Sequence, residues 1–248
     1  MLRGLKKTLK KGLSHAGIDL TKNMAYDRLT RQVMKKVLTT TSNCIDVGSH
    51  DGEVLEQILQ LSPEGRHFAF EPIPVYYEAL LRHFGNQVTI MPYALSDKEM
   101  VTDFQYVRNA PAYSGLKKRK YNTYNPDIQK IKVNTRGLDQ VIPDSISVDF
   151  IKIDVEGAEY LVLKGARNLV KRCRPFIVFE FGLGASDYYQ TDPEQLYNLL
   201  LDESGMQISL LSDFIRDKRP LSITEFVAHY RRNKEYYYIA HPPSSNRS

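Results

Sequence analysis

Residues 43–52 read Asn43-Cys44-Ile45-Asp46-Val47-Gly48-Ser49-His50-Asp51-Gly52. An apolar run carries one carboxylate near its end, glycines follow at positions 48 and 52, and a helical pattern of apolar residues begins at Glu53. This order predicts a buried strand, a tight turn and a helix. Ligands of open α/β sheets bind just outside the carboxyl ends of the strands. We therefore expect the functional site at this turn.

The chain on both sides of this turn repeats the same alternation. Expected strands at 67–70 and 88–91 are separated by a helix that Pro74 can open, because the first helical turn tolerates a missing N–H. This order calls for a parallel sheet with right-handed crossovers. Further strands are expected at 148–153, 175–181, 207–211 and 236–240, and further helices at 26–38, 156–170, 193–201 and 223–230. The seven core strands predict an α/β fold that a hairpin-like pair closes at its C-terminal end.

Residues 99–135 interrupt the alternation. Residues 101–107 and 131–135 read as two extra strands, and the polar, tyrosine-rich stretch 109–127 between them carries four consecutive cations at 117–120. A loop of this length is usually functional or disordered. We interpret it as a mobile basic loop. It is either a solvated, disordered tip or an arm over the site that recruits an acidic acceptor, and stacking on nucleic acid is less favoured.

The composition fits one large domain with extensions. The 248 residues are 42% hydrophobic and 25% charged, as is ordinary for a globular protein. No run approaches the ~20 apolar residues of a membrane span. Cys44 and Cys173 lie beside expected strands. We interpret them as reduced thiols in the core of a cytoplasmic protein, and not as a disulfide or a metal pair.

Positive charge is concentrated in two stretches. The net charge is +5, yet residues 3–11 and 117–120 together hold nine cations and no acid, so the remainder is mildly acidic. Residues 1–13 place leucines at helical spacing between lysines, which predicts a basic amphipathic helix. This helix either docks on the edge of the domain or makes peripheral contact with an anionic membrane surface or acidic partner.

Four expected strands end in a carboxylate, at Asp46, Glu71, Asp154 and Glu180. Because parallel strands point the same way, these acids should gather at one edge of the sheet. Any one of them could simply cap a neighbouring helix, but four at corresponding positions indicate a site. Glu71 lies 25 residues beyond Asp46. An acid near this place binds ribose hydroxyls in dinucleotide and nucleoside binders.

The glycines of the first turn decide which nucleoside fits. A pyrophosphate binder needs three closely spaced glycines, whereas this turn has only Gly48 and Gly52, with Asp51 placed to repel phosphate. The sequence also contains no P-loop motif. These features favour a ligand with a ribose and a positive centre but no phosphate. S-adenosylmethionine, with its sulfonium and ammonium groups, is such a ligand.

These residues and their spacing resemble the FkbM-type S-adenosylmethionine-dependent methyltransferases. The resemblance covers about residues 43–182 and is strongest in Ile151-Lys152-Ile153-Asp154-Val155-Glu156-Gly157-Ala158-Glu159. Other matching pieces lie at 45–52, 68–72, 94–97, 133–139, 162–166 and 175–180. His50 stands where the family often has asparagine, and the loop at 109–127 matches no family motif.

The resemblance implies a Rossmann-like seven-stranded methyltransferase sheet with helices on both faces and an antiparallel last strand. We place this methyltransferase domain at 41–242, with a hairpin insertion at 99–135, a basic helical extension at 1–40 and a tail at 243–248. The family typically methylates hydroxyl oxygens on sugars, glycans or polyketide-type products. We therefore expect a small-molecule or glycan acceptor, and an acceptor that is a nucleic acid is less favoured.

By similarity, three segments would contact S-adenosylmethionine. The first turn would hold the methionine part, the end of the second strand the ribose, and residues 92–95 the adenine. The residues concerned are Asp46, Gly48, Ser49, His50 and Gly52 in the turn, Glu71 and Pro72 after the second strand, and Ala94 and Leu95. Asp154 would border the cofactor and, with Glu156, face the reacting centre.

A hydroxyl group is a poor nucleophile until a base takes its proton. Asp154, Glu156, Glu180 and His50 are the candidates, and we favour Asp154 with Glu156. No metal is predicted, although a divalent ion held by these acids is an alternative. For the whole chain, the other hypotheses are a binding protein that keeps the fold without catalysis and a nicotinamide dehydrogenase, which the glycine pattern disfavours.

Overall fold

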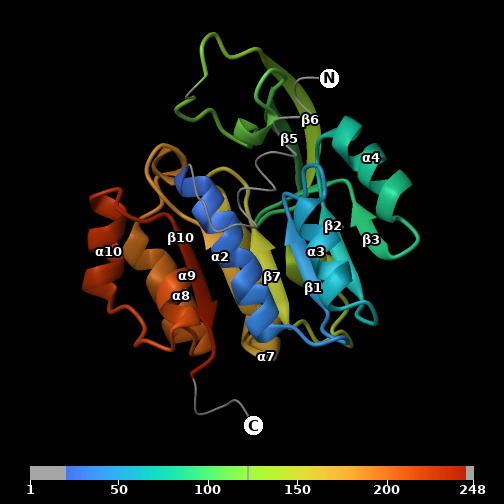
Figure 1. Cartoon of the computed structure of the whole chain (residues 1–248). Helices are drawn as coiled ribbons and strands as arrows, with labels where there is room; N and C mark the ends of the chain where they lie inside the picture. The colour runs from blue at the N-terminus through green and yellow to red at the C-terminus, as the bar shows by residue number, and fades with distance from the viewer. Residues whose placement is uncertain (1–20, 122, 244–248) are drawn as a thin grey trace.

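The computed structural model describes residues 21–121 and 123–243, and its core is a seven-stranded sheet (Figure 1). The strand order is β3-β2-β1-β7-β8-β10-β9, and the pairs are parallel except those of β10, which runs antiparallel to β8 and β9. The strands are β1 (Cys44–Val47), β2 (His67–Phe70), β3 (Val88–Met91), β7 (Phe150–Ile153), β8 (Phe176–Glu180), β9 (Gln207–Leu210) and β10 (Tyr237–His241). The predicted seven strands and antiparallel last strand are confirmed. The helix predicted at 1–13 lies outside the described residues.

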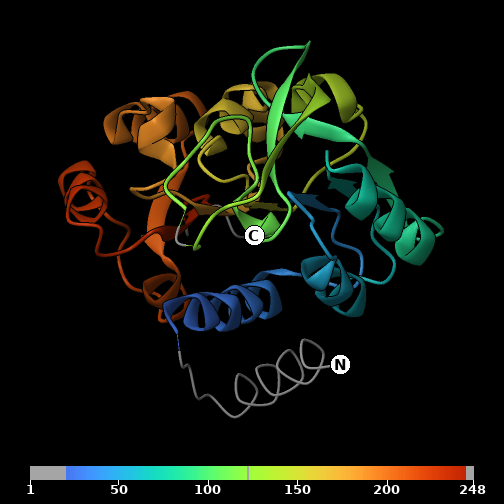
Figure 2. The ribbon, with the colours of Figure 1, turned by 90° about the horizontal axis from the view of Figure 1, so that it is seen from above.

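Helices cover both faces of this sheet, as Figures 1 and 2 show. One layer contains α2 (Lys22–Val37), α3 (Glu53–Leu61), α4 (Pro74–Phe84) and α9 (Leu211–Ile215). The other contains α5 (Leu138–Val141), α6 (Glu159–Lys164), α7 (Arg167–Cys173), α8 (Pro193–Ser204) and α10 (Ile223–Arg231). Along β1, Cys44 packs into the α2 layer, and Ile45 and Val47 pack into the α8 layer. Because both faces are covered, the strands read as nearly continuous apolar runs.

Several helix boundaries follow local signals in the sequence. Pro74 and Pro193 occupy the first turns of α4 and α8, and Gly205 ends α8 with a φ of +62°. The Ser222 and Glu225 side chains cap each other's backbone N–H groups at the start of α10. The two starts at proline and the stop at Gly205 agree with the prediction from sequence.

The single helix predicted at 156–170 is wrong. The chain leaves β7 through a turn and then forms two shorter helices, α6 and α7, on either side of Gly165. Within the turn Glu156 has a φ of +58° and Gly157 a φ of +107°, values that an α-helix does not contain. A Cβ on Gly165 would lie 2.1 Å from the Ser96 carbonyl oxygen, so two backbones touch at the break. Tertiary packing therefore overrides the apolar periodicity here.

A second, three-stranded sheet stands over one end of the main sheet (Figure 1). Its order is β4-β6-β5, with β4 (Tyr93–Leu95), β5 (Met100–Val107) and β6 (Ile128–Arg136). The antiparallel hairpin of β5 and β6 confirms the two predicted extra strands. The sequence did not predict β4, which pairs in parallel with β6 and ties this hairpin to the main domain.

The basic loop between β5 and β6 is docked and not free. The Lys117 N–H donates to the Tyr189 hydroxyl (3.0 Å), and the Lys120 N–H donates to the Gly184 carbonyl oxygen (3.2 Å). The Gly115 backbone also pairs with Gln105 of β5. The arm expected to be mobile is therefore held against the segment that follows β8.

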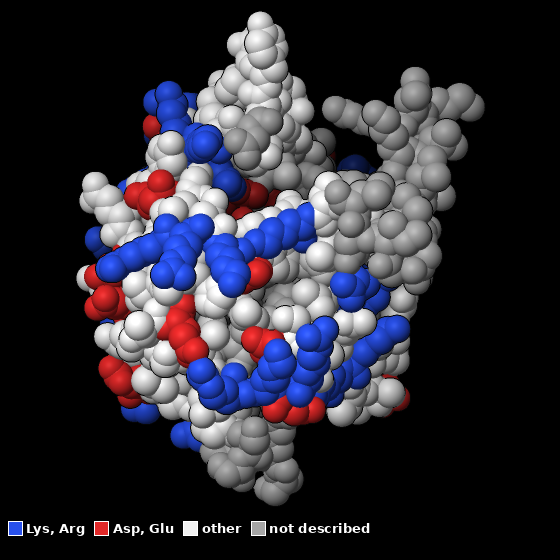
Figure 3. Space-filling view, turned by 60° about the vertical axis from the view of Figure 1, so that its left-hand side comes forward, with Lys and Arg blue, Asp and Glu red and all other residues white. Residues whose placement is uncertain are grey.

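Basic and acidic side chains are mixed over the surface. On the face shown in Figure 3, bands of Lys and Arg have Asp and Glu side chains between them. Among the described residues, the pair Lys36–Asp217 (2.6 Å) joins α2 to the segment after α9, and Lys218 pairs with Asp213 (2.9 Å). Within 21–121 and 123–243, none of the helices combines the length and the apolar character that crossing a bilayer requires.

Candidate active site

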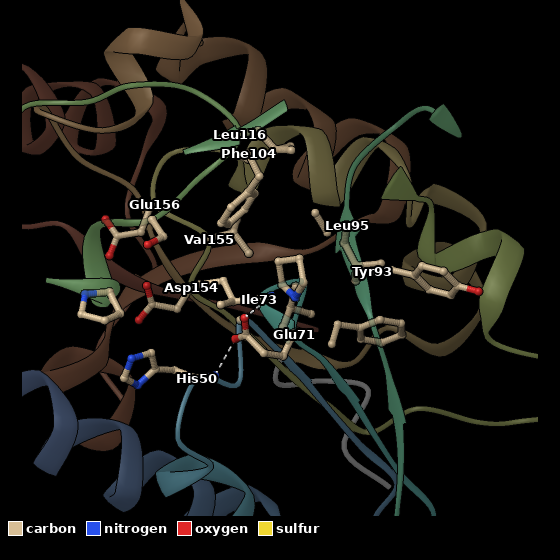
Figure 4. A pocket seen from close by; sticks show the side chains of 18 of the residues that line it. His50, Glu71, Ile73, Tyr93, Leu95, Phe104, Leu116, Asp154, Val155 and Glu156 are labelled. Carbon is tan, nitrogen blue, oxygen red and sulfur yellow. Dashed lines mark hydrogen bonds between the residues drawn. The ribbon is translucent and has the colours of Figure 1, made fainter. Parts of the chain in front are cut away.

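Strand-end carboxylates meet at one edge of the sheet, but not all of them at one point. Oxygen atoms of Asp154, Glu156 and Glu180 all lie within 4.8 Å of one another. Glu71 lines the same cavity as Asp154 and Glu156, and all three are visible in Figure 4. Asp46 is separate, because it is buried within β1 on the α2 side of the sheet, where it pairs in register with Lys152.

The cavity has a volume of about 230 Å³ and lies above the carboxyl ends of β1, β2 and β7. One end is largely apolar and is lined by Ile73, Tyr93, Leu95 and Phe104. The other end reaches Asp154 and Glu156. Its remaining lining comes from the first turn, the end of β2, β4, the turn after β7, and the insertion: Val47, Gly48, His50, Phe70, Glu71, Pro72, Ala94, Pro111, Ala112, Ser114, Leu116, Val155 and Ala158.

The first turn packs directly on the turn after β7. Gly48 has a φ of +81°, and a Cβ there would lie 2.0 Å from the Asp154 carbonyl oxygen, so only glycine fits. His50 follows with a φ of +46°, and its ring packs at a tilt of 31° against Tyr76 with 4.3 Å between the ring centres. This close approach of two backbones places both turns at the same cavity.

Glu71 connects the first turn to the end of β2. Its Oε2 accepts the His50 N–H and its Oε1 accepts the Ile73 N–H, each at 2.9 Å (Figure 4). Burial raises the pKa of Glu71, and these two hydrogen bonds act against that rise. Each carboxylate oxygen can accept a further hydrogen bond, so the side chain can still bind hydroxyl groups in the cavity.

Asp154 is held in its charged form. Its Oδ2 accepts hydrogen bonds from Lys152 Nζ (3.1 Å) and from the Tyr237 hydroxyl (2.6 Å). Burial acts to raise the pKa of Asp154, but the Lys152 charge and the two hydrogen bonds outweigh it, so the pKa lies below its ordinary value. Asp154 is therefore a carboxylate at neutral pH.

Glu180 lies next to Asp154, but its pKa is shifted in the opposite direction. Burial, followed by the charges of Asp154 and Glu159, raises the pKa of Glu180 to about 8, while Lys152 and Arg119 lower it less. At neutral pH Glu180 therefore carries a proton beside the ionised Asp154, with which it is hydrogen-bonded. Two such carboxyl groups titrate as a pair.

Glu156 lies on a turn that Glu159 stabilises. The Glu159 side chain is buried, and its Oε1 accepts the N–H groups of Val155 (3.2 Å) and Gly157 (3.1 Å). Burial raises the pKa of Glu159 to about 7. The Glu156 side chain itself forms an ion pair with Arg119 of the insertion. The insertion thus contributes a charged group to the acidic end of the cavity.

A larger hollow of about 680 Å³ adjoins the cavity between α2 and α3. Gly48, His50 and Asp154 line both spaces. The larger hollow is rich in charged and amide side chains, and Lys152 and Tyr237 also line it. A polar route therefore leads to Asp154 from the α2 side of the molecule.

The structure gathers most of the predicted site residues around these two spaces. Those that line the cavity are Gly48, His50, Glu71, Pro72, Ala94, Leu95, Asp154 and Glu156, and those that line only the larger hollow are Asp46 and Ser49. Gly52 lines neither. It precedes α3, and a Cβ there would lie 2.5 Å from the Phe84 ring, so its role is packing.

The sequence pattern did not predict three side chains that contact the carboxylates of the site: Arg119, Lys152 and Tyr237. Lys152 had a signal, since a lysine inside an otherwise apolar strand must find a partner when it is buried. Arg119 stands among three lysines, and nothing in the sequence around it separates it from them. Tyr237 lies on the last strand, and its approach to Asp154 follows only from the placement of β10 beside β8.

The cavity fits S-adenosylmethionine. Its apolar end suits a flat base, and Glu71 beyond it can accept hydrogen bonds from ribose hydroxyls. The Gly48 turn lets the backbone approach a ligand closely. In the adjoining hollow, Asp46 has a buried oxygen, Oδ2, without a hydrogen-bond partner, which suits an ammonium group. Seven strands with an antiparallel β10 and a nucleoside cavity at β1 and β2 define the class of S-adenosylmethionine-dependent methyltransferases.

Comparisons with known proteins identify the family within this class. Residues 46–206 match the methyltransferase FkbM domain, and the chain therefore belongs to the FkbM methyltransferase family. It is 26% identical over 194 residues to the 2-O-methyltransferase NoeI of Sinorhizobium fredii (strain NBRC 101917 / NGR234), with 72% of this chain and 79% of that protein covered.

A solved structure shows the same fold. It is the methyltransferase FkbM from Methylobacillus flagellatus KT, with a TM-score of 0.51 and 17% sequence identity. The match covers 82% of this chain but only 44% of that one, so this chain spans less than half of that protein's length.

Proposed function

We propose that this protein transfers a methyl group from S-adenosylmethionine to a hydroxyl oxygen of a sugar, a glycan or a natural product. The observation that carries the proposal is the single cavity that joins a nucleoside-sized apolar end, through Glu71, to the carboxylates Asp154 and Glu156. The similarity to a 2-O-methyltransferase supports oxygen as the acceptor atom.

We assign the cavity lining to the parts of the cofactor. Tyr93, Ala94 and Leu95 would flank the adenine, and Glu71 would accept hydrogen bonds from the ribose hydroxyls. The first turn, together with Asp46, would hold the methionine part. When bound, the cofactor supplies a methyl group on a positively charged sulfur, which an acceptor oxygen can attack in line.

The chain's own residues would then position the acceptor and remove its proton. An acceptor oxygen must be held roughly 3–3.5 Å from the methyl carbon, and much of the rate gain comes from this positioning. Lys152 and Tyr237 both donate hydrogen bonds to Oδ2 of Asp154, so neither of them engages the other carboxylate oxygen, Oδ1. We assign proton acceptance to the Asp154–Glu180 pair, because the ion pair with Arg119 engages Glu156.

The larger hollow suits the acceptor. Its polar lining can hydrogen-bond a hydroxyl-rich molecule, and it reaches Asp154 beside the cavity. A glycan that entered between α2 and α3 would bring a hydroxyl group to the cavity's acidic end.

Labelled methyl transfer tests this proposal. The protein is incubated with S-adenosylmethionine carrying an isotopically labelled methyl group and with panels of glycans, polyhydroxylated natural products and RNA. We expect label in a hydroxyl-bearing small molecule or glycan, as a methyl ether in the mass spectrum of the product. Label on RNA, or on nitrogen or carbon alone, would contradict the proposed acceptor class.

A further inference from the structure

Arg119 is unlike the other cations of its loop. Lys117, Lys118 and Lys120 are exposed, whereas the Arg119 side chain is only 10% exposed and points inward to Glu156. Its Nε–H also donates to the Gly184 carbonyl oxygen (3.2 Å), and its guanidinium lies over the Tyr113 ring at 5.2 Å. One side chain therefore contacts the insertion, the turn after β7 and the segment after β8.

Glu156 belongs to a triangle whose spacing would suit a cation. The oxygens of Asp154, Glu156 and Glu180 lie within 4.8 Å of one another, as they do around a divalent metal ion. A planar guanidinium is also a good partner for carboxylates in a partly buried place. Arg119 reaches this triangle through Glu156, and its charge is close enough to act on Glu180.

Charge balance explains why a cation is needed there. Lys152 neutralises Asp154 from the α2 side of the sheet, and Glu180 keeps its proton at neutral pH. The carboxylate of Glu156 then requires a second positive group, because a buried charge without a partner is costly. Arg119 supplies that group from the insertion, 37 residues before Glu156 in the chain.

We propose that Arg119 is a positioning residue of the reacting centre: its guanidinium takes the place of a divalent cation beside Glu156, Asp154 and Glu180, and it holds the insertion closed over the cavity. This inference rests on the reacting centre being at Asp154, as in the proposed function. In this proposal the docked insertion supplies, through Arg119, the positive charge that balances Glu156.

Binding of Mn²⁺ tests the proposal without any knowledge of the acceptor. Removal of the guanidinium should leave three carboxyl groups with metal-ligand spacing. We expect Arg119→Ala to bind one Mn²⁺ at least about tenfold more tightly than the wild type, by electron paramagnetic resonance or calorimetry. The gain should disappear in Arg119→Ala combined with Glu156→Gln, and Arg119→Lys should stay close to the wild type because it keeps a cation.

Two further variants test whether any change in Mn²⁺ affinity comes from the loss of the Arg119 charge. Lys118→Ala removes an exposed cation from the same loop and should not change Mn²⁺ affinity. If Arg119→Ala does not fold, Arg119→Met, which keeps most of the side-chain volume, should show the same gain. A folded, uncharged variant at position 119 with the Mn²⁺ affinity of the wild type would overturn the proposal, as would an equal gain in Lys118→Ala.

Cofactor affinity is measured in parallel to separate the two proposals. Lys118 is exposed and does not line the cavity, so S-adenosylmethionine should bind Lys118→Ala within about threefold of the wild type. A wild type that does not bind S-adenosylmethionine would overturn the proposed function alone. An unchanged Mn²⁺ affinity in the folded, uncharged variants Arg119→Ala and Arg119→Met would overturn the role of Arg119 alone.

Discussion

Two neighbouring carboxyl groups at the end of the cavity have opposite protonation. Asp154 stays ionised because Lys152 and Tyr237 stabilise its charge, whereas burial and the charge of Asp154 keep a proton on Glu180. A catalytic base works best with a pKa near the working pH. At neutral pH the proton acceptor of the pair is Asp154, whose pKa is below its ordinary value. Only above about pH 8, where Glu180 also loses its proton, does the pair accept a proton with a pKa near the working pH.

Substitution of Asp154 tests its role at the level of one side chain. We expect Asp154→Asn to lower turnover by about 10²- to 10⁴-fold at saturating cofactor, the usual contribution of a general base. Turnover is measured with the acceptor found by labelled transfer. Asp144→Asn, which changes an aspartate whose side chain is 96% exposed, is the matched control and should keep full turnover. Full turnover in a folded Asp154→Asn would rule out the assignment.

The carboxylates of the site could be predicted from the sequence, but the side chains that pair with them could not. Glu71, Asp154 and Glu180 could be found because each lies at the end of an apolar strand, and strand ends share one edge in a parallel sheet. Asp46, expected at the same edge, lies inside β1. Arg119 and Tyr237 could not be found, because they come from a loop and from the antiparallel last strand, whose contacts depend on tertiary packing. Glu156, predicted as the partner of Asp154 in proton removal, is engaged by its ion pair with Arg119.

The elements were predictable where hydrophobic pattern and turn residues agree. The strands β2 and β3 and the start of α4 fall where the pattern placed them, since their ends carry proline, glycine or a strand-end acid. The helix at 156–170 failed because its apolar periodicity continues through a turn that needs positive φ at Glu156 and Gly157. The strand β4 is only three residues long, and its partner β6 lies about 40 residues away.

The contact between the first turn and the turn after β7 can be tested at Gly48. Gly48→Ala would add a strained φ and a clash with the Asp154 backbone, and we expect it to lower the free energy of unfolding by about 2 to 5 kcal/mol. Gly205→Ala is the control, because Gly205 also has a positive φ but has nothing within 4 Å of the added Cβ. It should cost only about 1 to 2 kcal/mol.

Urea unfolding monitored by circular dichroism measures both Gly→Ala variants. Equal losses of unfolding free energy in the two variants would mean that the first turn and the turn after β7 are not in close backbone contact. A further loss of cofactor affinity in a folded Gly48→Ala is expected, because the same turn lines the cavity.

Across the whole molecule, four buried acids with raised pKa values make stability depend on pH: Asp46, Glu71, Glu159 and Glu180. Burial raises the pKa of Asp46 and of Glu159 to about 7, and burial together with neighbouring charges raises that of Glu180 to about 8. The folded state therefore binds more protons than the unfolded state in this range, so stability falls as pH rises. Buried His67, with a lowered pKa, acts the other way only below about pH 6.5.

Between about pH 6.5 and 8 the protein without ligand should thus lose about 2 to 3 kcal/mol of unfolding free energy. Urea titrations at several pH values measure this loss. The triple substitution Asp46→Asn, Glu159→Gln and Glu180→Gln should flatten the dependence. Stability that stays constant or rises over this range in the wild type would show that these acids are ionised in the folded state.

The cavity between Tyr93 and Asp154 is expected to bind S-adenosylmethionine through Glu71. Isothermal titration calorimetry tests it with the wild type, Glu71→Ala and the control Glu78→Ala, which removes an exposed glutamate of α4. We predict one equivalent bound by the wild type and by Glu78→Ala. Binding to Glu71→Ala should be at least about tenfold weaker, because hydrogen bonds to a charged acceptor contribute about 1.5 to 3 kcal/mol. No binding by the wild type, or undiminished binding by a folded Glu71→Ala, would contradict the account.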